Sequence, residues 1–276
     1  LHRHLEGSLR LETMVEVARE RGMPFRDANQ LRALVQVNDG EPYNFRNFLS
    51  KFETLRTFYQ SPEIIGRFTQ EAVADAAADN VRYLELRFTP AALSAAQGFP
   101  FDEVMDWVIE NVEASSQRNG ILTRLIVSLN RHESVQLAEK VTRLAVDRMR
   151  QGIVGLDLAG NEAQFPALPF AGVIREAQQA GLHITIHAGE WGGAENVGEA
   201  IHHLQAERIG HGVRVLEDPA VVELARDREV AFCVCMTSNL QSGIVARLEE
   251  HPVRAMLLAG LNVTLNTDDP GISQIR

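Results

Sequence analysis

The feature that most constrains the fold is a regular alternation of helix-like and strand-like segments from residue 62 onward. Amphipathic stretches with helical spacing alternate with short apolar runs, a pattern typical of strands buried on both faces. The predicted helices cover residues 62–79, 101–117, 133–150, 170–180, 194–205, 219–228 and most of 245–259, and the predicted strands cover residues 81–88, 121–129, 153–158, 182–186, 208–210, 230–234 and 261–265.

Residues 1–4 resemble the end of one more strand, which brings the total to about eight strand units without a linker, repeat or low-complexity tract between them. This rhythm favours a closed (β/α)8 barrel of the TIM type over an open sheet. We therefore expect one barrel domain over residues 1–276, trimmed at both termini. Between the strand end and residue 62, the sequence predicts a helix at 11–21 and then a less regular region to residue 60.

Charge, hydrophobicity and cysteine content limit the possible partners and the cellular location of the protein. The net charge of −10 and the lack of any Lys or Arg run argue against a nucleic-acid partner. No apolar run is long enough to span a membrane, and no secretory leader is visible. Cys233 and Cys235 are two apart on a predicted strand, which places them on one face and does not suggest a disulfide framework. We expect a cytoplasmic protein, and the sequence leaves its oligomeric state open.

Polar residues follow the predicted strands, and in a barrel the carboxyl ends of all strands converge on one face. Residues far apart in the chain therefore become neighbours there. The strand ends carry His2 and His4, residues 160–162, His187 and Glu190, His211, residues 237–239, and the pair Asp268 and Asp269.

Three of these ends predict a metal site. His2 and His4 are two apart, so both rings project to the same side of the first strand. With His187 and one carboxylate of the aspartate pair they supply three nitrogens and one oxygen, a set that suits zinc and keeps a position open for water. The alternative is that His2 and His4 are surface residues near a fraying terminus. Only two lysines occur and neither is near a strand end, so we expect one metal and not a lysine-bridged pair.

The other ionisable groups predict acid–base chemistry. Zinc can lower the pKa of a bound water from about 15.7 to near 7, and we expect His211 to help take that proton and hold the hydroxide in line. Glu190 can deliver a proton to the substrate, which contributes roughly 10² to 10⁴ in rate. One of Asp268 and Asp269 is expected to reach the metal and the other to bond to the substrate. The alternative for the aspartates and Pro270 is an ordinary turn.

Six segments together resemble the signature blocks of the adenosine deaminase family, in the family's order and over nearly the whole chain. They are residues 2–7, 157–160, 187–190, 208–212, 237–239 and 266–270. The resemblance implies a barrel of the amidohydrolase type with one catalytic zinc, which hydrolyses the 6-amino group of a purine nucleoside and releases ammonia. The residues that match the zinc ligands are His2, His4, His187 and Asp268.

The resemblance also implies the contacts of a small purine nucleoside or base. Glu190 matches the proton donor to the purine ring and His211 the residue beside the hydroxide. Asp269 matches the partner of the five-membered ring, and Gly160 matches a backbone contact to the base. His4 and Glu6 are further expected substrate contacts. Residues 45–52 are similar to the family's helical cover over the site, although their three Phe residues also suit a core helix.

Two departures from the family pattern leave the substrate open. Glu6 stands where adenosine-specific members usually carry Asp, at a position that contacts the ribose. Met236 stands where the family usually has Pro. Adenine and 5′-modified adenosines, such as aminodeoxyfutalosine or methylthioadenosine, therefore remain candidate substrates. The residues are also compatible with a mononuclear amidohydrolase that opens a cyclic amide, and with a barrel that binds nucleosides or partners without turnover.

Overall fold

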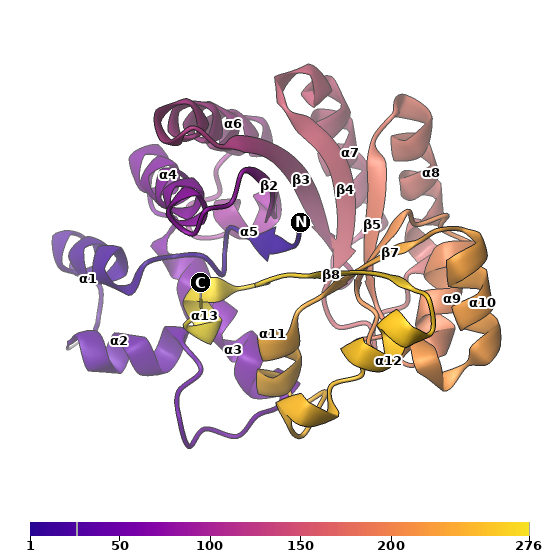
Figure 1. The fold of residues 1–276 in the computed structure, drawn as a ribbon. Coiled ribbons are helices and arrows are strands. Elements are labelled where there is room, and N and C mark those ends of the chain that lie inside the picture. Colours follow the sequence, from indigo (N-terminus) through magenta and orange to yellow (C-terminus); the bar gives the residue numbers. More distant parts are fainter. Residues whose placement is uncertain (26, 276) are drawn as a thin grey trace.

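In a computed structural model that describes residues 1–25 and 27–275, parallel strands form one eight-stranded sheet in sequence order (Figure 1). The expected (β/α)8 architecture is confirmed. The strands are β1 Arg3–His4, β2 Tyr83–Phe88, β3 Leu122–Asn130, β4 Ile153–Ala159, β5 His183–Ala188, β6 Arg208–His211, β7 Ala231–Val234 and β8 Asn262–Leu265.

The barrel is closed by contacts between β1 and the residues just beyond β8. Arg3 forms an isolated parallel bridge with Asp268, beyond the end of β8. The backbone N–H of His4 donates to the carbonyl of Asp268 (2.9 Å), and the N–H of Asp268 donates to the carbonyl of His2 (3.0 Å). Closure therefore sets two histidines from the start of the chain beside an aspartate near its end.

Helices cover the outside of the sheet, and α6 to α9 contact β3 to β5 (Figure 1). The apolar core lies between these helices and the strands. The helices are α1 Leu11–Glu20, α2 Ala28–Val35, α3 Phe45–Leu55, α4 Pro62–Ala78, α5 Pro90–Ser94, α6 Phe101–Asn119, α7 Val135–Asp147, α8 Ala171–Ala180, α9 Ala194–His202, α10 Pro219–Asp227, α11 Met236–Gln241, α12 Val253–Leu258 and α13 Pro270–Ser273.

Two predictions on helices were wrong. The region up to residue 60 is not irregular, because it holds α2 and α3, whose first turns are capped by the side chains of Asp27 and Asn44. Residues 245–259 are not mostly helix either: the α-helical part is α12, preceded by a short 3-10 turn at Leu248–Glu250. His251 is extended there because it precedes Pro252, whose ring disfavours a helical residue before it.

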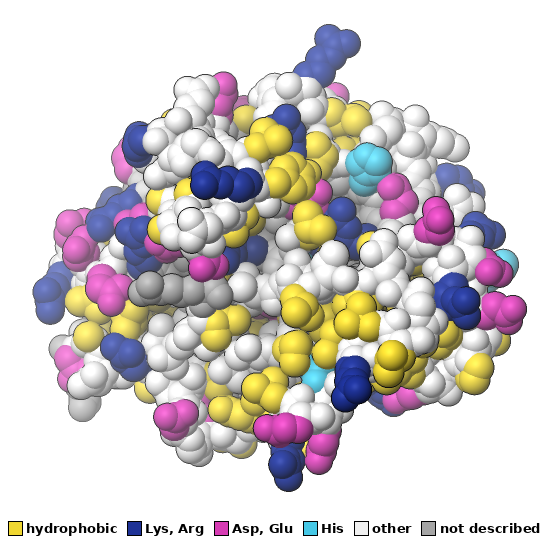
Figure 2. Space-filling view, viewed as in Figure 1, with side chains coloured by type: hydrophobic (Ala, Val, Ile, Leu, Met, Phe, Trp, Pro, Cys, Tyr) yellow, Lys and Arg dark blue, Asp and Glu magenta, His cyan; other side chains and the backbone are white. Residues whose placement is uncertain are grey.

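The surface carries both charge signs, and hydrophobic side chains gather where Figure 1 places β8 and α12 (Figure 2). Leu257, Leu258 and Leu265 are exposed in these two elements. Cys233 and Cys235 are buried free thiols. Within the described part of the chain, every helix is too short or too polar to cross a bilayer.

Candidate active site

Four side chains from three strand ends meet in one cluster. His2 Nε2 lies 3.1 Å from His4 Nε2, which lies 3.3 Å from His187 Nε2. Asp268 Oδ1 lies 3.1 Å from His2 Nε2 and 3.5 Å from His4 Nε2. These four atoms lie within 4.8 Å of one another, and we call the residues the histidine–aspartate cluster. The structure thus brings together every residue predicted as a metal ligand.

The donor set of this cluster fits a zinc ion. With Zn–N and Zn–O distances of about 2.0–2.2 Å, the edges of a ligand tetrahedron measure roughly 3.3–3.5 Å, close to the separations observed. Burial lowers the pKa of His4 to about 3, so its ring is neutral and offers a lone pair. With their Nε2 atoms unprotonated, the three rings and the carboxylate of Asp268 would direct their lone pairs at one point, which is the arrangement that a zinc ion requires.

Asp157 and Arg87 support the cluster from behind, and neither was assigned a role from the sequence. His187 Nδ1 lies 3.0 Å from Asp157 Oδ1, and Arg87 Nε lies 3.6 Å from Asp157 Oδ2. Burial alone would raise the pKa of Asp157, but the charges of His187 and Arg87 lower it to about 2. The carboxylate therefore accepts a hydrogen bond from Nδ1–H of His187, which leaves Nε2 unprotonated with a lone pair available for a metal. The signal that could have found Asp157 is its place in the 157–160 block.

Glu190 lies beside the cluster at the start of the β5–α9 loop. Burial raises the pKa of its carboxyl group well above the usual range, and the nearby charge of Asp268 adds to this. Burial thus favours the protonated form of Glu190 over the carboxylate. Its side-chain oxygen lies 3.7 Å from His211 Nε2.

Glu162 holds the loop that carries Glu190. Its carboxylate accepts from the backbone N–H groups of Gly189 (3.0 Å), Glu190 (2.6 Å) and Trp191 (2.7 Å), and from the Asn196 side chain (2.9 Å). Glu162 is buried, and four donors satisfy its charge. Sequence reasoning placed this residue at the end of β4 but gave it no role, because its partners lie on a different strand end.

Two residues of the site have left-handed backbone conformations. His211 has φ 61° and Asp268 has φ 58°, values that cost energy for residues other than glycine. Burial lowers the pKa of His211 to about 4, although Asp268 opposes the shift. A neutral His211 ring is thus aimed at Asp268, with Nε2 3.8 Å from Oδ2.

A cavity of about 270 Å³ opens above the cluster, and we call it the substrate cavity. Its walls include His4, Glu6, Gly160, Glu190, His211 and Asp269, together with Phe48, Leu49 and Phe52 of α3. All the expected substrate contacts therefore line one space, and the segment predicted as a cover lies over it. His2 does not line the cavity, because it sits behind the other ligands.

The floor of the substrate cavity holds two buried carboxyl groups with unpaired oxygens. Among the described residues, Glu6 Oε2 and Asp269 Oδ1 have no hydrogen-bond partner. Glu6 is fixed by its other oxygen, which accepts from the N–H of Thr89 (2.6 Å). Gly7 leaves room for Asp269, since a Cβ there would lie 1.8 Å from Asp269 Oδ1. Unpaired buried oxygens of this kind are available to a ligand.

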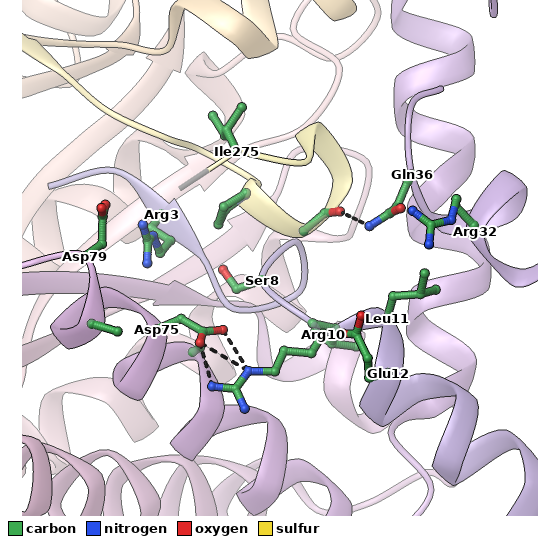
Figure 3. Close-up of a pocket in the computed structure, with 15 residues that line it drawn as sticks. Arg3, Ser8, Arg10, Leu11, Glu12, Arg32, Gln36, Asp75, Asp79 and Ile275 are labelled. Atoms are coloured by element: carbon green, nitrogen blue, oxygen red, sulfur yellow. Dashed lines mark hydrogen bonds and ion pairs between the residues drawn. The ribbon is translucent and has the colours of Figure 1, made fainter. Parts of the chain in front are cut away.

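A larger cavity of about 480 Å³ lies on the other side of β1 (Figure 3). Successive residues of a strand point to opposite faces, so Arg3 faces this cavity while His2 and His4 face the cluster. Arg10 forms an ion pair with Asp75 across it (2.5 Å), as the dashed lines in Figure 3 show. None of the predicted site residues lines this cavity.

Met236 is the first residue of α11. The first turn of a helix tolerates proline because the backbone N–H of that position has no helical partner. Either residue therefore fits here, and the departure from the family pattern at Met236 needs no change in the site.

A sequence model of the adenosine deaminase family matches residues 1–276. The chain is 38% identical to an adenosine deaminase of Klebsiella pneumoniae strain 342 and 39% identical to one of Erwinia tasmaniensis. Each alignment spans 279 residues, all of this chain and 83% of the relative.

Solved structures with a similar fold include an adenine deaminase and a protein that binds a purine nucleotide. An adenine deaminase from Arthrobacter aurescens is similar with a TM-score of 0.90 and 30% identity, over 99% of this chain and 82% of that one. An amidohydrolase from Burkholderia ambifaria with bound Zn has a TM-score of 0.89 and 26% identity, over 100% and 76%. Arabidopsis ADAL complexed with GMP has a TM-score of 0.87 and 27% identity, over 99% and 81%.

Proposed function

Because the chain belongs to the adenosine deaminase family, we propose that its site hydrolyses the 6-amino group of adenosine or a closely related 6-aminopurine nucleoside. The products are the 6-oxo purine nucleoside and ammonia, so the enzyme is a hydrolase acting on a C–N bond of a cyclic amidine. The observation that carries this proposal is the position of Glu190, a buried carboxyl group with a raised pKa, beside the histidine–aspartate cluster and lining the same cavity.

The proposed cofactor is one zinc ion held by His2, His4, His187 and Asp268. When bound, zinc supplies a Lewis acid that lowers the pKa of water to near 7 and so provides a nucleophile at neutral pH. Three imidazole nitrogens and one carboxylate oxygen favour zinc over magnesium or calcium, which prefer oxygen ligands. The similar amidohydrolase with bound Zn is consistent with this choice.

The proposed roles of the other residues follow from their protonation. Glu190 carries a proton and donates it to a ring nitrogen of the purine, which makes the adjacent carbon more electrophilic. Burial, and then the charge of Asp268, raise the pKa of Asp269, so this carboxyl group also offers a proton to the five-membered ring. The backbone at Gly160 lines the same cavity and contacts the base, while His211 orients the attacking water.

Helix α3 is proposed to exclude water from the reaction. Phe48, Leu49 and Phe52 line the substrate cavity from this helix. Water exclusion strengthens the interactions of Glu190 and Asp269 with the purine, because charges interact more strongly at low dielectric constant.

Glu6 supports a nucleoside over a free base. Its unpaired oxygen Oε2 is buried, and a buried acceptor without a donor costs roughly 1–3 kcal/mol. A ribose hydroxyl can supply that donor, whereas adenine has no sugar hydroxyl. The second candidate, adenine, is favoured by the similarity to the Arthrobacter aurescens adenine deaminase.

An absorbance assay on one zinc-loaded preparation tests the substrate. It compares adenosine, 2′-deoxyadenosine, adenine and two 5′-modified adenosines, with ammonia release measured in parallel. We expect the highest kcat/KM with adenosine. A higher value with adenine or a 5′-modified adenosine would move the assignment to that substrate. Binding of adenosine without ammonia release from any compound would instead indicate a barrel without turnover.

We also propose a cytoplasmic location, supported by the two buried free thiols.

A further inference from the structure

Two polar residues that the proposed chemistry does not use lie directly behind His211. Asn239 in α11 places its side-chain Nδ2 3.1 Å from His211 Nδ1. His251, just before α12, places Nε2 3.2 Å from Asn239 Oδ1. Asn239 is fully buried and His251 is 6% exposed. These contacts form one line of hydrogen bonds that ends at the ring of His211.

One backbone group determines which atom donates and which accepts in each of these hydrogen bonds. The N–H of Val253 donates to His251 Nδ1 at 3.1 Å. A backbone N–H can only donate, so His251 Nδ1 carries a lone pair and no proton. Burial lowers the pKa of His251, which keeps the ring neutral. A neutral ring without a proton on Nδ1 must carry it on Nε2, so His251 Nε2 donates to Asn239.

The same reasoning then determines the orientation of the Asn239 amide and the tautomer of His211. Because His251 donates, the atom of Asn239 that faces it must be the carbonyl oxygen, and the NH2 group must face His211. His211 Nδ1 is therefore an acceptor. The flipped amide would set an NH2 group against the N–H of His251, a contact between two donors. One fixed donor thus determines three successive hydrogen bonds.

We infer that His251 and Asn239 are positioning residues that lock His211 as the tautomer protonated on Nε2. In this form the Nε2–H points toward Asp268 Oδ2 and Glu190 Oε2, at 3.8 Å and 3.7 Å. His211 then donates a hydrogen bond to the oxygen of the attacking water or hydroxide and orients its lone pair toward the substrate. This tautomer differs from the expectation from the sequence that His211 helps to take the proton of that water. The functional part of this inference rests on the proposed deaminase activity, whereas the tautomer itself does not.

Asn239→Asp tests the inference with a side chain of the same shape. An aspartate can only accept, so it forces a proton onto His211 Nδ1 while still accepting from His251. The tautomer is read from the 15N chemical shifts of the histidine rings in labelled zinc-loaded protein, with His211 assigned by its loss in His211→Gln. We expect His211 Nε2 to be protonated in the parent protein and Nδ1 in the variant. We expect kcat to fall roughly 10²- to 10⁴-fold in the variant with little change in KM.

Substitutions at His251 separate positioning from packing. Glutamine can still donate to Asn239, so His251→Gln is expected to keep the parent tautomer and most of kcat, whereas His251→Leu is expected to lose both. The matched control is His203→Leu at an exposed position, which should change neither readout. A His211 ring protonated on Nδ1 in the parent protein, or full kcat in Asn239→Asp, would overturn the inference. A protein inactive on every purine but with the expected tautomer would reject the proposed function and leave the tautomer assignment standing.

Discussion

The Nδ1 atom of His187 lies 3.0 Å from Oδ1 of Asp157, on the side of the ring opposite to the histidine–aspartate cluster. His2 differs, since its Nδ1 has no partner among the described residues. His187 is thus held in one orientation by a buried carboxylate, which in turn has Arg87 beside it. Such support from behind a ligand raises the basicity of the nitrogen that faces the metal.

Asp157→Asn is expected to weaken zinc binding about 10- to 100-fold. Arg87 and the hydroxyl of Ser128 (3.3 Å) hold one side of residue 157, so the new amide keeps its oxygen toward them and turns its NH2 group to His187. The proton of His187 then moves to Nε2, which can no longer bind the metal. Zinc affinity is measured by competition with a chelating dye. The control is Asp147→Asn at an exposed site, and equal affinities for parent and Asp157→Asn would reject this role.

Glu190→Gln is expected to retain about one zinc per chain and to lower kcat by roughly 10² to 10⁴. Glutamine keeps the shape and burial of Glu190 but cannot transfer a proton. Steady-state kinetics with adenosine and metal analysis of the same sample give both quantities. Full turnover in this variant would contradict the assigned role of the carboxyl group.

Glu162→Gln is expected to lower both stability and kcat while the metal stays bound. The amide NH2 of glutamine would face one of the backbone N–H groups at 189–191, leaving a donor unpaired at a cost of about 1–3 kcal/mol. The loop that carries Glu190 then loses its anchor. Chemical denaturation and kinetics check the two effects, with exposed Glu176→Gln as the control. Unchanged kcat would show that the loop does not need this carboxylate.

Removal of the metal is expected to lower the thermal midpoint, and zinc is expected to restore it. The four ligand atoms lie within 4.8 Å of one another in the folded chain and lose this arrangement on unfolding. A ligand at 100 times its Kd stabilises the folded state by about 2.7 kcal/mol. Calorimetry before and after chelation measures the shift, and magnesium serves as the comparison ion. Saturation at two zinc ions per chain would contradict a mononuclear site.

The stability of the fold is expected to depend on pH through the ion pair between Glu85 of β2 and Arg208 of β6. This pair lies inside the barrel, at the end opposite to the substrate cavity. Burial alone would raise the pKa of Glu85, but the hydrogen bond and charge of Arg208 hold it below its usual value. A carboxyl group with a lowered folded-state pKa stabilises the fold above its unfolded pKa and loses this contribution as pH falls through the folded value. Glu85→Gln should therefore be less stable than the parent at pH 7, and the difference should shrink as the pH falls through the lowered folded-state pKa of Glu85. Glu110→Gln, at an exposed site, is the control. A difference that stays constant with pH would show that this pair does not titrate as expected.

Much of the fold was predictable because its signals are local. Apolar runs of strand length alternate with helical periodicity from residue 62, and β2 to β8 appear within two residues of their predicted starts. Predictions failed where local signals conflict. At α2 and α3 the helices are short and depend on caps at Asp27 and Asn44, and at residues 245–259 Pro252 breaks an otherwise helical pattern.

By itself, the sequence determined the alternation of elements and the types of residue at the strand ends, because side-chain periodicity and donor chemistry belong to short segments. Only the tertiary structure decided how these ends are supported. The contact of Asp157 with His187, the hydrogen bonds of Glu162 to the Glu190 loop and the line from Val253 to His211 join different strands, loops and helices. The physical reason is that hydrogen bonds have direction and a short reach, so their partners exist only once the barrel has closed and brought its strand ends together.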